Sequence, residues 1–158
     1  MVPRDTTLAV VACELPGLQA YAQRHGWSVD WRPEPLVLIL DGRHPADGSP
    51  VRLHADVTGY RAVPPGWRFI SHDGEPPSAT RAPKPGTLPG NIGSIFHANG
   101  IICAPFNRLA YAEHSGPHGD WGGPAKWLGV RGHVTAKELG QMLAQIVLHL
   151  KYSPGWQI

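Results

Sequence analysis

The amino-acid sequence predicts an α+β fold with an N-terminal helix, a four-stranded antiparallel meander, a cysteine-bearing loop and a C-terminal helix. Three observations predict it. Apolar residues recur at helical spacing towards both ends of the chain, whereas short β-favouring runs occupy the middle. Proline and glycine separate these runs from one another. A chain of 158 residues can bury one proper core, so we expect a single domain over residues 1–158.

The first half of the chain supplies the first helix and the strands of the meander. The helix is expected over Leu15–Arg24, where Pro16 suits an opening turn and Gly26 ends the pattern. Residues 41–50 are rich in turn formers, and the strand after them alternates between apolar and polar side chains. The four expected strands are Trp27–Trp31, Leu36–Leu40, Val51–Val57 and Trp67–Ile70.

The second half of the chain contains two long irregular segments and a helix. Residues 71–93 are rich in Pro, Gly and Ser, which indicates a long surface loop, and residues 104–132 are also irregular. The C-terminal helix is the clearest element, because Thr135 and Glu138 form a Thr-x-x-Glu capping box ahead of an apolar stripe. That stripe is typical of a core rather than a cofactor site; it consists of Leu139, Met142, Leu143, Ile146, Val147 and Leu150.

Composition and charge disfavour several kinds of partner. The net charge is only +2 and the basic residues are scattered, which argues against nucleic acid. No apolar run approaches the roughly 20 residues of a membrane span. The residues before Cys13 superficially match a lipoprotein cleavage box, but the apolar run from Leu8 to Ala12 is short for a signal peptide. We therefore expect a cytoplasmic protein with reduced thiols, in which Cys13 is a buried structural residue.

Cys103 is the main candidate for chemistry. It follows an Asn-Gly turn signal at Asn99 and Gly100, a few residues after His97. A thiol is a nucleophile suited to acyl transfer, and a nearby neutral amide can stabilise an oxyanion. Asn99 is thus either an oxyanion donor or a residue of the turn itself. His97 fits hydrogen bonds that shape the loop better than it fits a general base, and the alternative for Cys103 is a buried structural thiol.

Two parts of the chain resemble the ubiquitin-conjugating enzymes, or E2 proteins, in a divergent prokaryotic form. The stretch from Tyr60 to Phe69 is similar to the family's Tyr-Pro-x-x-Pro-Pro-x-x-x-Phe segment, with Pro64 and Pro65 at matching positions and Arg61 in place of the first proline. Residues 95–99 are similar to the family's Ile-Tyr-His-Pro-Asn, and residues 100–103 fit the Gly-x-Ile-Cys around its thioester cysteine. The order of the expected elements agrees over residues 15–151.

The resemblance implies an E2-like domain that carries a ubiquitin-like protein as a thioester. Cys103 would accept the modifier from an E1-like adenylating enzyme and pass it to an amine of an acceptor protein. It implies no bound cofactor and no metal, and a role such as antiphage defence in bacteria. In the family several residues separate the asparagine from the glycine, whereas here Asn99 adjoins Gly100. Either the turn is shortened, or Asn99 belongs to it and the family's oxyanion asparagine has no counterpart.

A group of ionisable residues follows on a Gly-rich stretch: His114, His118 and Asp120. These side chains suit a proton shuttle or an orienting group for the incoming amine, a metal site, or solvated loop residues. Trp121 and Trp127 would cover the site or a partner surface, or pack in the core. Two other functions stay open at this point. One is a non-catalytic E2 variant that binds a ubiquitin-like protein on its sheet, and the other is a metal- or thiol-dependent hydrolase.

Overall fold

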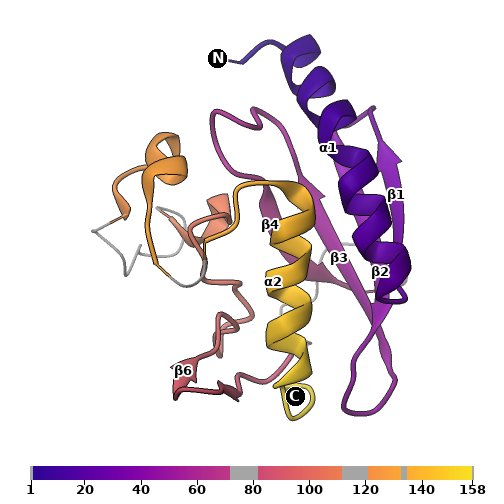
Figure 1. The fold of residues 1–158 in the computed structure, drawn as a ribbon, viewed down its shortest axis with the longest axis vertical. Helices are drawn as coiled ribbons and strands as arrows, with labels where there is room; N and C mark the ends of the chain where they lie inside the picture. The colour runs from indigo at the N-terminus through magenta and orange to yellow at the C-terminus, as the bar shows by residue number, and fades with distance from the viewer. Residues whose placement is uncertain (1, 72–81, 112–120, 133–134, 158) are drawn as a thin grey trace.

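The computed structural model describes residues 2–71, 82–111, 121–132 and 135–157, and these residues form an α+β structure (Figure 1). In chain order its elements are α1 (Arg4–Arg24), β1 (Ser28–Arg32), β2 (Val37–Arg43), β3 (Pro50–Asp56), β4 (Gly66–Ile70), β5 (Thr87–Leu88), β6 (Ile92–Gly93), the 3₁₀ helices η1 (Arg108–Ala110) and η4 (Pro124–Gly129), and α2 (Leu139–Lys151).

The first four strands form one antiparallel sheet in the order β1-β2-β3-β4, which confirms the predicted meander. Apolar side chains of β3 are fully buried, and the polar side chains between them are partly exposed. Leu53 of β3 pairs with Leu40 of β2 on one side and with Phe69 of β4 on the other. One row of apolar side chains therefore crosses the sheet and faces the core.

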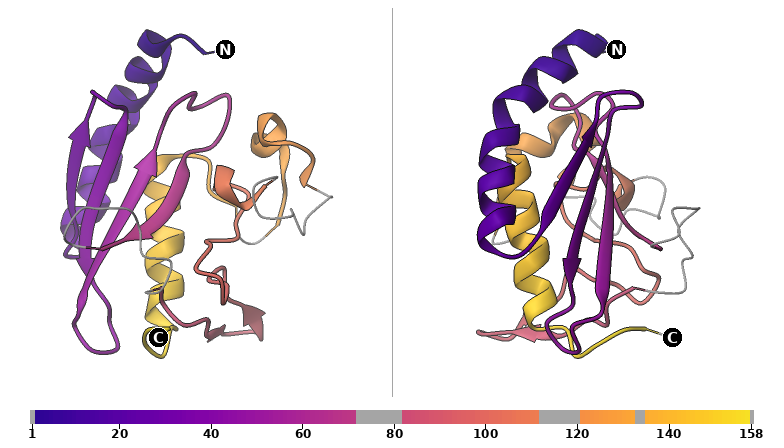
Figure 2. Two further views of the ribbon diagram at one scale, coloured as in Figure 1. Left: turned by 180° about the vertical axis from the view of Figure 1, so that it is seen from behind. Right: turned by 90° about the vertical axis from the view of Figure 1, so that its right-hand side faces the viewer.

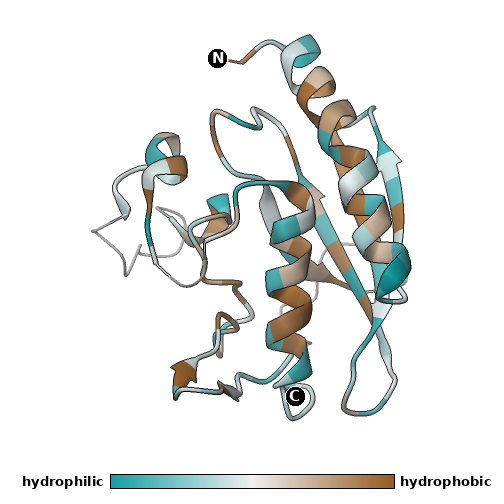
Figure 3. Cartoon of the chain, viewed as in Figure 1, coloured by the Kyte–Doolittle hydropathy of each residue, from teal (hydrophilic) through white to brown (hydrophobic). Residues whose placement is uncertain are grey.

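Both α-helices cover the same face of the sheet and lie side by side (Figure 2). Their backbones approach closely at Gly17 and Gly140, where a Cβ atom on Gly140 would lie 3.4 Å from the carbonyl oxygen of Gly17. Each helix ends in a basic residue, Arg24 in α1 and Lys151 in α2, and the ends of both helices are hydrophilic in Figure 3; a cation there offsets the negative end of the helix dipole. The core lies between this helical layer and the sheet.

The first helix is longer than the sequence predicts, because α1 begins at Arg4 rather than at Leu15. Pro16 lies inside the helix and does not open it. The residues that α1 buries, Thr7, Val11, Leu18 and Ala22, share one face over the whole length of the helix. Packing of that face outweighs the one backbone bond that proline removes. The prediction of a buried Cys13 is wrong as well, since its side chain is exposed.

The start of α2 differs from the predicted capping box. The Thr135 hydroxyl donates to the carbonyl of Gly132 at 3.1 Å, and the Glu138 side chain makes no capping bond. Instead, the Glu14 carboxylate of α1 accepts the backbone N–H of Leu139 at 2.8 Å. The predicted apolar stripe is confirmed: its residues are buried apart from Val147, which is partly buried.

The strand β2 continues through Arg43, past the predicted start of the turn at Asp41. Arg52 in the facing strand binds the Asp41 carboxylate at 2.7 Å, which favours pairing over a turn. Gly42 leaves room for the indole of Trp27, because a Cβ atom there would lie 2.2 Å from the ring.

The two irregular segments contain short regular elements. Residues 71–93 include the small hairpin of β5 and β6, and residues 104–132 include η1 and η4. Among the residues that the structure describes, no helix combines the length and apolar character that a membrane crossing requires.

Candidate functional site

Cys103 lies at the end of a short hairpin that we call the cysteine hairpin, residues 95–103. Phe96 pairs with Ile102 across it in an antiparallel bridge, and the N–H of Cys103 donates to the carbonyl of Ile95 at 2.7 Å. Gly100 adopts a φ of +86° in the turn, a conformation that suits glycine. The chain therefore reverses direction between the two strands and returns Cys103 to a position beside Ile95.

Asn107 ties the cysteine hairpin to the edge of the sheet. Its buried amide nitrogen donates to the carbonyls of Ile102 at 2.8 Å and Trp67 at 3.1 Å. Its amide oxygen accepts the N–H groups of Trp67 at 2.8 Å and Leu109 at 3.2 Å. One side chain thus satisfies four buried backbone groups and fixes the hairpin beside β4.

Two further side chains, from α2 and from the segment after it, hold the other strand of the hairpin. The Nδ1 atom of His149 accepts the N–H of Ile95 at 3.2 Å, and both residues are buried. The amide nitrogen of Gln157 donates to the carbonyl of His97 at 2.9 Å. The hairpin that carries Cys103 is therefore bonded to the sheet, to α2 and to the C-terminal segment.

Cys103 and His97 line the same surface pocket, which has a volume of about 340 Å³. Trp121, Arg131 and Thr135 form other parts of its wall. Trp121 packs against Tyr111 with ring centroids 5.3 Å apart. The structure thus brings Cys103, His97, Trp121 and Arg131 together around one pocket.

The Cys103 side chain lies mostly below the surface of this pocket, since the residue is only 9 % exposed. Burial raises the pKa of the Cys103 thiol because the charged thiolate loses solvation. The thiolate fraction at neutral pH is therefore smaller than that of a free cysteine. In this conformation the site holds a protected thiol rather than an activated one.

Asn99 occupies the turn of the hairpin and does not line the pocket. Its side chain is exposed, and its amide oxygen accepts the N–H of Ile101 at 3.1 Å. Of the two interpretations of Asn99, the structure shows the geometry of the turn residue. His97 shapes the loop through its main chain, whose carbonyl accepts from Gly100 at 2.9 Å, and the residue also lines the pocket.

The remaining predicted site residues divide into two groups. Trp127 is a core residue whose indole N–H donates to the carbonyl of Arg61 at 3.0 Å. His114, His118 and Asp120 lie outside the described residues. Within the described ranges, no group of three or more His, Cys, Asp or Glu side chains is arranged to hold a metal ion.

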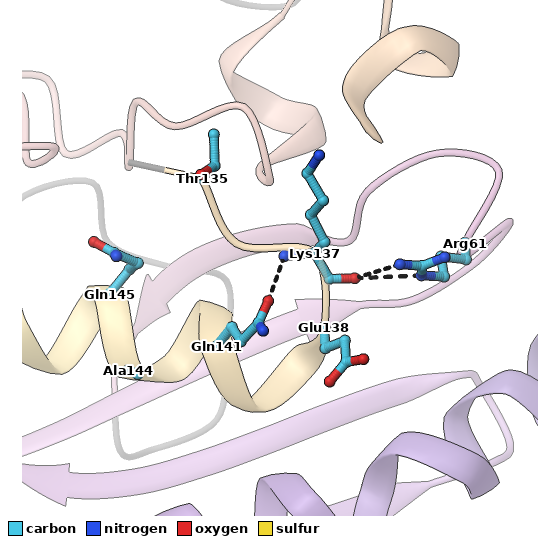
Figure 4. A pocket seen from close by; sticks show the side chains of 7 residues that line it. All are labelled: Arg61, Thr135, Lys137, Glu138, Gln141, Ala144 and Gln145. Carbon is cyan, nitrogen blue, oxygen red and sulfur yellow. Dashed lines mark hydrogen bonds between the residues drawn. The ribbon is translucent and has the colours of Figure 1, made fainter. Parts of the chain in front are cut away.

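A second pocket, of about 470 Å³, lies at the start of α2 (Figure 4). The Arg61 guanidinium donates to the carbonyl of Lys137 at 3.1 and 3.3 Å, and the Lys137 N–H donates to the amide oxygen of Gln141 at 3.0 Å. Thr135 lines both this pocket and the Cys103 pocket, so the two hollows adjoin. Their shared wall is the segment that leads into α2.

The Tyr60–Phe69 segment is anchored beneath this second pocket. The Tyr60 hydroxyl donates to the Glu14 carboxylate at 2.8 Å, and the Arg61 guanidinium lies 3.8 Å from the same carboxylate. Burial raises the pKa of Glu14 and also that of Tyr60. One partly buried carboxylate therefore joins α1, this segment and the first amide of α2.

Sequence reasoning missed the residues that hold the site together: Glu14, Asn107, His149 and Gln157. Of these, His149 offers a recognisable signal, because it is a polar residue between Ile146 and Leu150 on the buried side of α2. The partners of Glu14 and Gln157 lie far away in the sequence, and Asn107 reaches Trp67 across 40 positions besides its near neighbours Ile102 and Leu109.

Acidification provides a test of the buried His149. Burial lowers the pKa of His149 to about 4, whereas the unfolded chain has the ordinary value near 6.5. The unfolded state binds the extra proton between these values, so this stabilisation is present above about pH 6.5 and is lost as the pH falls towards 4. Through His149 alone, the free energy of unfolding should fall by about 2 kcal/mol between pH ~7 and ~4.5.

Urea unfolding across this pH range measures the effect. His149→Asn is the matched control, because its amide oxygen can accept the Ile95 N–H but does not titrate. We expect the wild type to lose more stability than this variant on acidification. Parallel pH profiles for the two proteins would contradict the assignment.

The chain was compared with protein-family models, with curated proteins and with solved structures, and none of them matches it. The likeness to ubiquitin-conjugating enzymes therefore rests on the quoted motifs, and the site on the geometry described above.

Proposed function

We propose that this protein carries a ubiquitin-like modifier as a thioester on Cys103 and transfers it to an amine. The observation that carries the proposal is that Cys103 and His97 line one surface pocket, with Cys103 on a hairpin anchored from three sides. A carrier needs a thiol that a flexible polypeptide end can reach and that stays in place while two large partners exchange. The order of helix, meander, cysteine hairpin and helix supports the resemblance to E2 proteins, and the ubiquitin-like modifier is inferred from that resemblance.

The proposed chemistry consists of two acyl transfers. The thiolate of Cys103 attacks the acyl carbon of the modifier held as a thioester on the E1-like enzyme, so that a new C–S bond forms and the enzyme's thiolate leaves. An acceptor amine then attacks the same carbon, a C–N bond forms, and Cys103 leaves as a thiolate that regains the proton lost by the amine. ATP is consumed by the E1-like enzyme, which activates the modifier beforehand.

A charging assay tests this proposal. The protein is incubated with its E1-like enzyme, the modifier and ATP, and adducts are separated with and without a reducing agent. We expect a thiol-reducible adduct in the wild type and its complete loss in Cys103→Ala. Cys103→Ser should give an adduct that resists reduction, because an oxyester replaces the thioester.

Cys13→Ser is the matched control, because Cys13 is the exposed cysteine and lies on α1 away from the pocket. This variant should charge like the wild type. The proposal fails if active E1-like enzyme produces no adduct, or if the adduct persists in Cys103→Ala.

A specific observation favours a second candidate, the non-catalytic binding module. Cys103 is almost buried and its pKa is raised, both of which suit a structural thiol. In that case the modifier would bind wild type and Cys103→Ala with equal affinity in a titration, and no adduct would form with either protein.

A further inference from the structure

His149 links the second helix to the cysteine hairpin. It lies in the last turn of α2, and only 1 % of the residue is exposed. Its Nδ1 atom accepts the N–H of Ile95, at 3.2 Å, across 54 positions of the sequence. Because Nδ1 accepts, the ring proton of the neutral imidazole resides on Nε2.

Ile95 is bonded on both sides of its backbone. Its N–H donates to His149, and its carbonyl accepts the N–H of Cys103 at 2.7 Å. Two consecutive hydrogen bonds therefore connect the imidazole to the backbone of the cysteine. A shift of Ile95 relative to α2 moves Cys103 with it.

Aromatic packing fixes the imidazole in this position. The Phe96 ring meets His149 edge to face with centroids 6.1 Å apart, and it meets Phe69 of β4 in the same manner at 5.5 Å. The cysteine hairpin is thus held between the sheet and α2, and the hydrogen bond from Ile95 to His149 is a direct polar link between the hairpin and α2.

We propose that His149 is a positioning residue, which sets how deeply Cys103 sits in its pocket. The imidazole holds Ile95, Ile95 holds the backbone of Cys103, and the Cys103 residue as a whole stays 9 % exposed. Loss of the acceptor frees the hairpin strand from α2 and lets the thiol move outwards. The consequence for thioester transfer rests on the proposed function, whereas the placement of the thiol does not.

The rate of alkylation of Cys103 by iodoacetamide tests the proposal without any partner protein. All variants carry Cys13→Ser, so that Cys103 is the thiol that reacts. His149→Leu removes the acceptor and should raise the alkylation rate about tenfold, because the hairpin opens more often. His149→Asn supplies an amide oxygen near the position of Nδ1 and should stay within about threefold of the parent.

A stability control separates positioning from general loosening. Val11→Ala shortens a fully buried side chain of α1 and destabilises the fold at a distance from the hairpin. Its alkylation rate should stay near that of the parent, even where its free energy of unfolding falls as much as that of His149→Leu or more. Equal alkylation rates for the Leu variant, the Asn variant and the parent would overturn the proposal, as would a Val11→Ala rate as high as that of His149→Leu.

Two measurements keep the test decisive if His149→Leu does not fold. Nitrogen NMR of the parent protein should show the proton on Nε2 of His149, and a proton on Nδ1 overturns the proposal. With the E1-like enzyme and modifier, His149→Asn should transfer at a rate near that of the parent. If the parent forms no adduct but the alkylation rates follow the expected order, the proposed function fails while the positioning role stands.

Discussion

Asn107→Ala should lower the free energy of unfolding by about 4 kcal/mol, because four buried backbone groups lose their partner at once. Asn107 is fully buried, so water cannot replace the missing amide without entering the core. An unsatisfied buried group costs about 1–3 kcal/mol, and partial relaxation reduces the sum. Urea or thermal unfolding measures the loss, and the Cys103 thiol should become more reactive because Ile102 loses its tie to β4.

Asn99→Ala is the matched control for this prediction. It makes the same chemical change within the hairpin that Asn107 anchors, but Asn99 is exposed and its side-chain oxygen accepts one bond, from Ile101. We expect a loss of less than about 1 kcal/mol, since water can satisfy the freed N–H. Similar losses for the two variants would show that Asn107 is not the link between hairpin and sheet.

Glu14→Ala should destabilise the fold by about 3 kcal/mol, which is the second largest effect that we expect. The change removes the acceptor of the Leu139 N–H and of the Tyr60 hydroxyl, and the carboxylate beside Arg61. Glu14→Gln keeps an oxygen for the Leu139 amide and should cost roughly 1 kcal/mol. Chemical unfolding of both variants at neutral pH provides the measurement.

Thr135→Ala distinguishes this assignment from the capping box that the sequence favours. Because the Thr135 hydroxyl bonds to Gly132 outside α2, its loss should cost no more than about 0.5 kcal/mol. A larger loss for Thr135→Ala than for Glu14→Ala would restore Thr135 as the cap of α2.

Local patterns predicted those parts of the fold that depend on near neighbours in the sequence. The alternation in β3 and the apolar stripe of α2 are both present in the structure, because each pattern repeats within a single element. The same reasoning failed at Pro16, where a local helix signal competes with the packing of an entire helix face. It failed again at Asp41, whose partner Arg52 is in the next strand.

The candidate site was predicted in part. The sequence singled out His97 and Cys103 as neighbours in one short run, and the structure shows that both line one pocket. The role of Asn99 could not be decided from the sequence, because an Asn-Gly pair suits a turn and an oxyanion donor alike. The burial of the Cys103 thiol could not be predicted from the sequence either, since residues from β4, α2 and the C-terminal segment determine it.

The sequence by itself determined the fold class, the four strands of the meander, the buried face of α2 and the cysteine on which the proposal rests. Only the tertiary structure decided where α1 begins, what caps α2 and what holds Cys103 in place. The physical reason is separation along the chain. Glu14 meets Leu139 across 125 positions and Ile95 meets His149 across 54, whereas sequence periodicity is a property of windows of roughly 11–18 residues. Bonds over such distances form once the helices and the sheet have packed together.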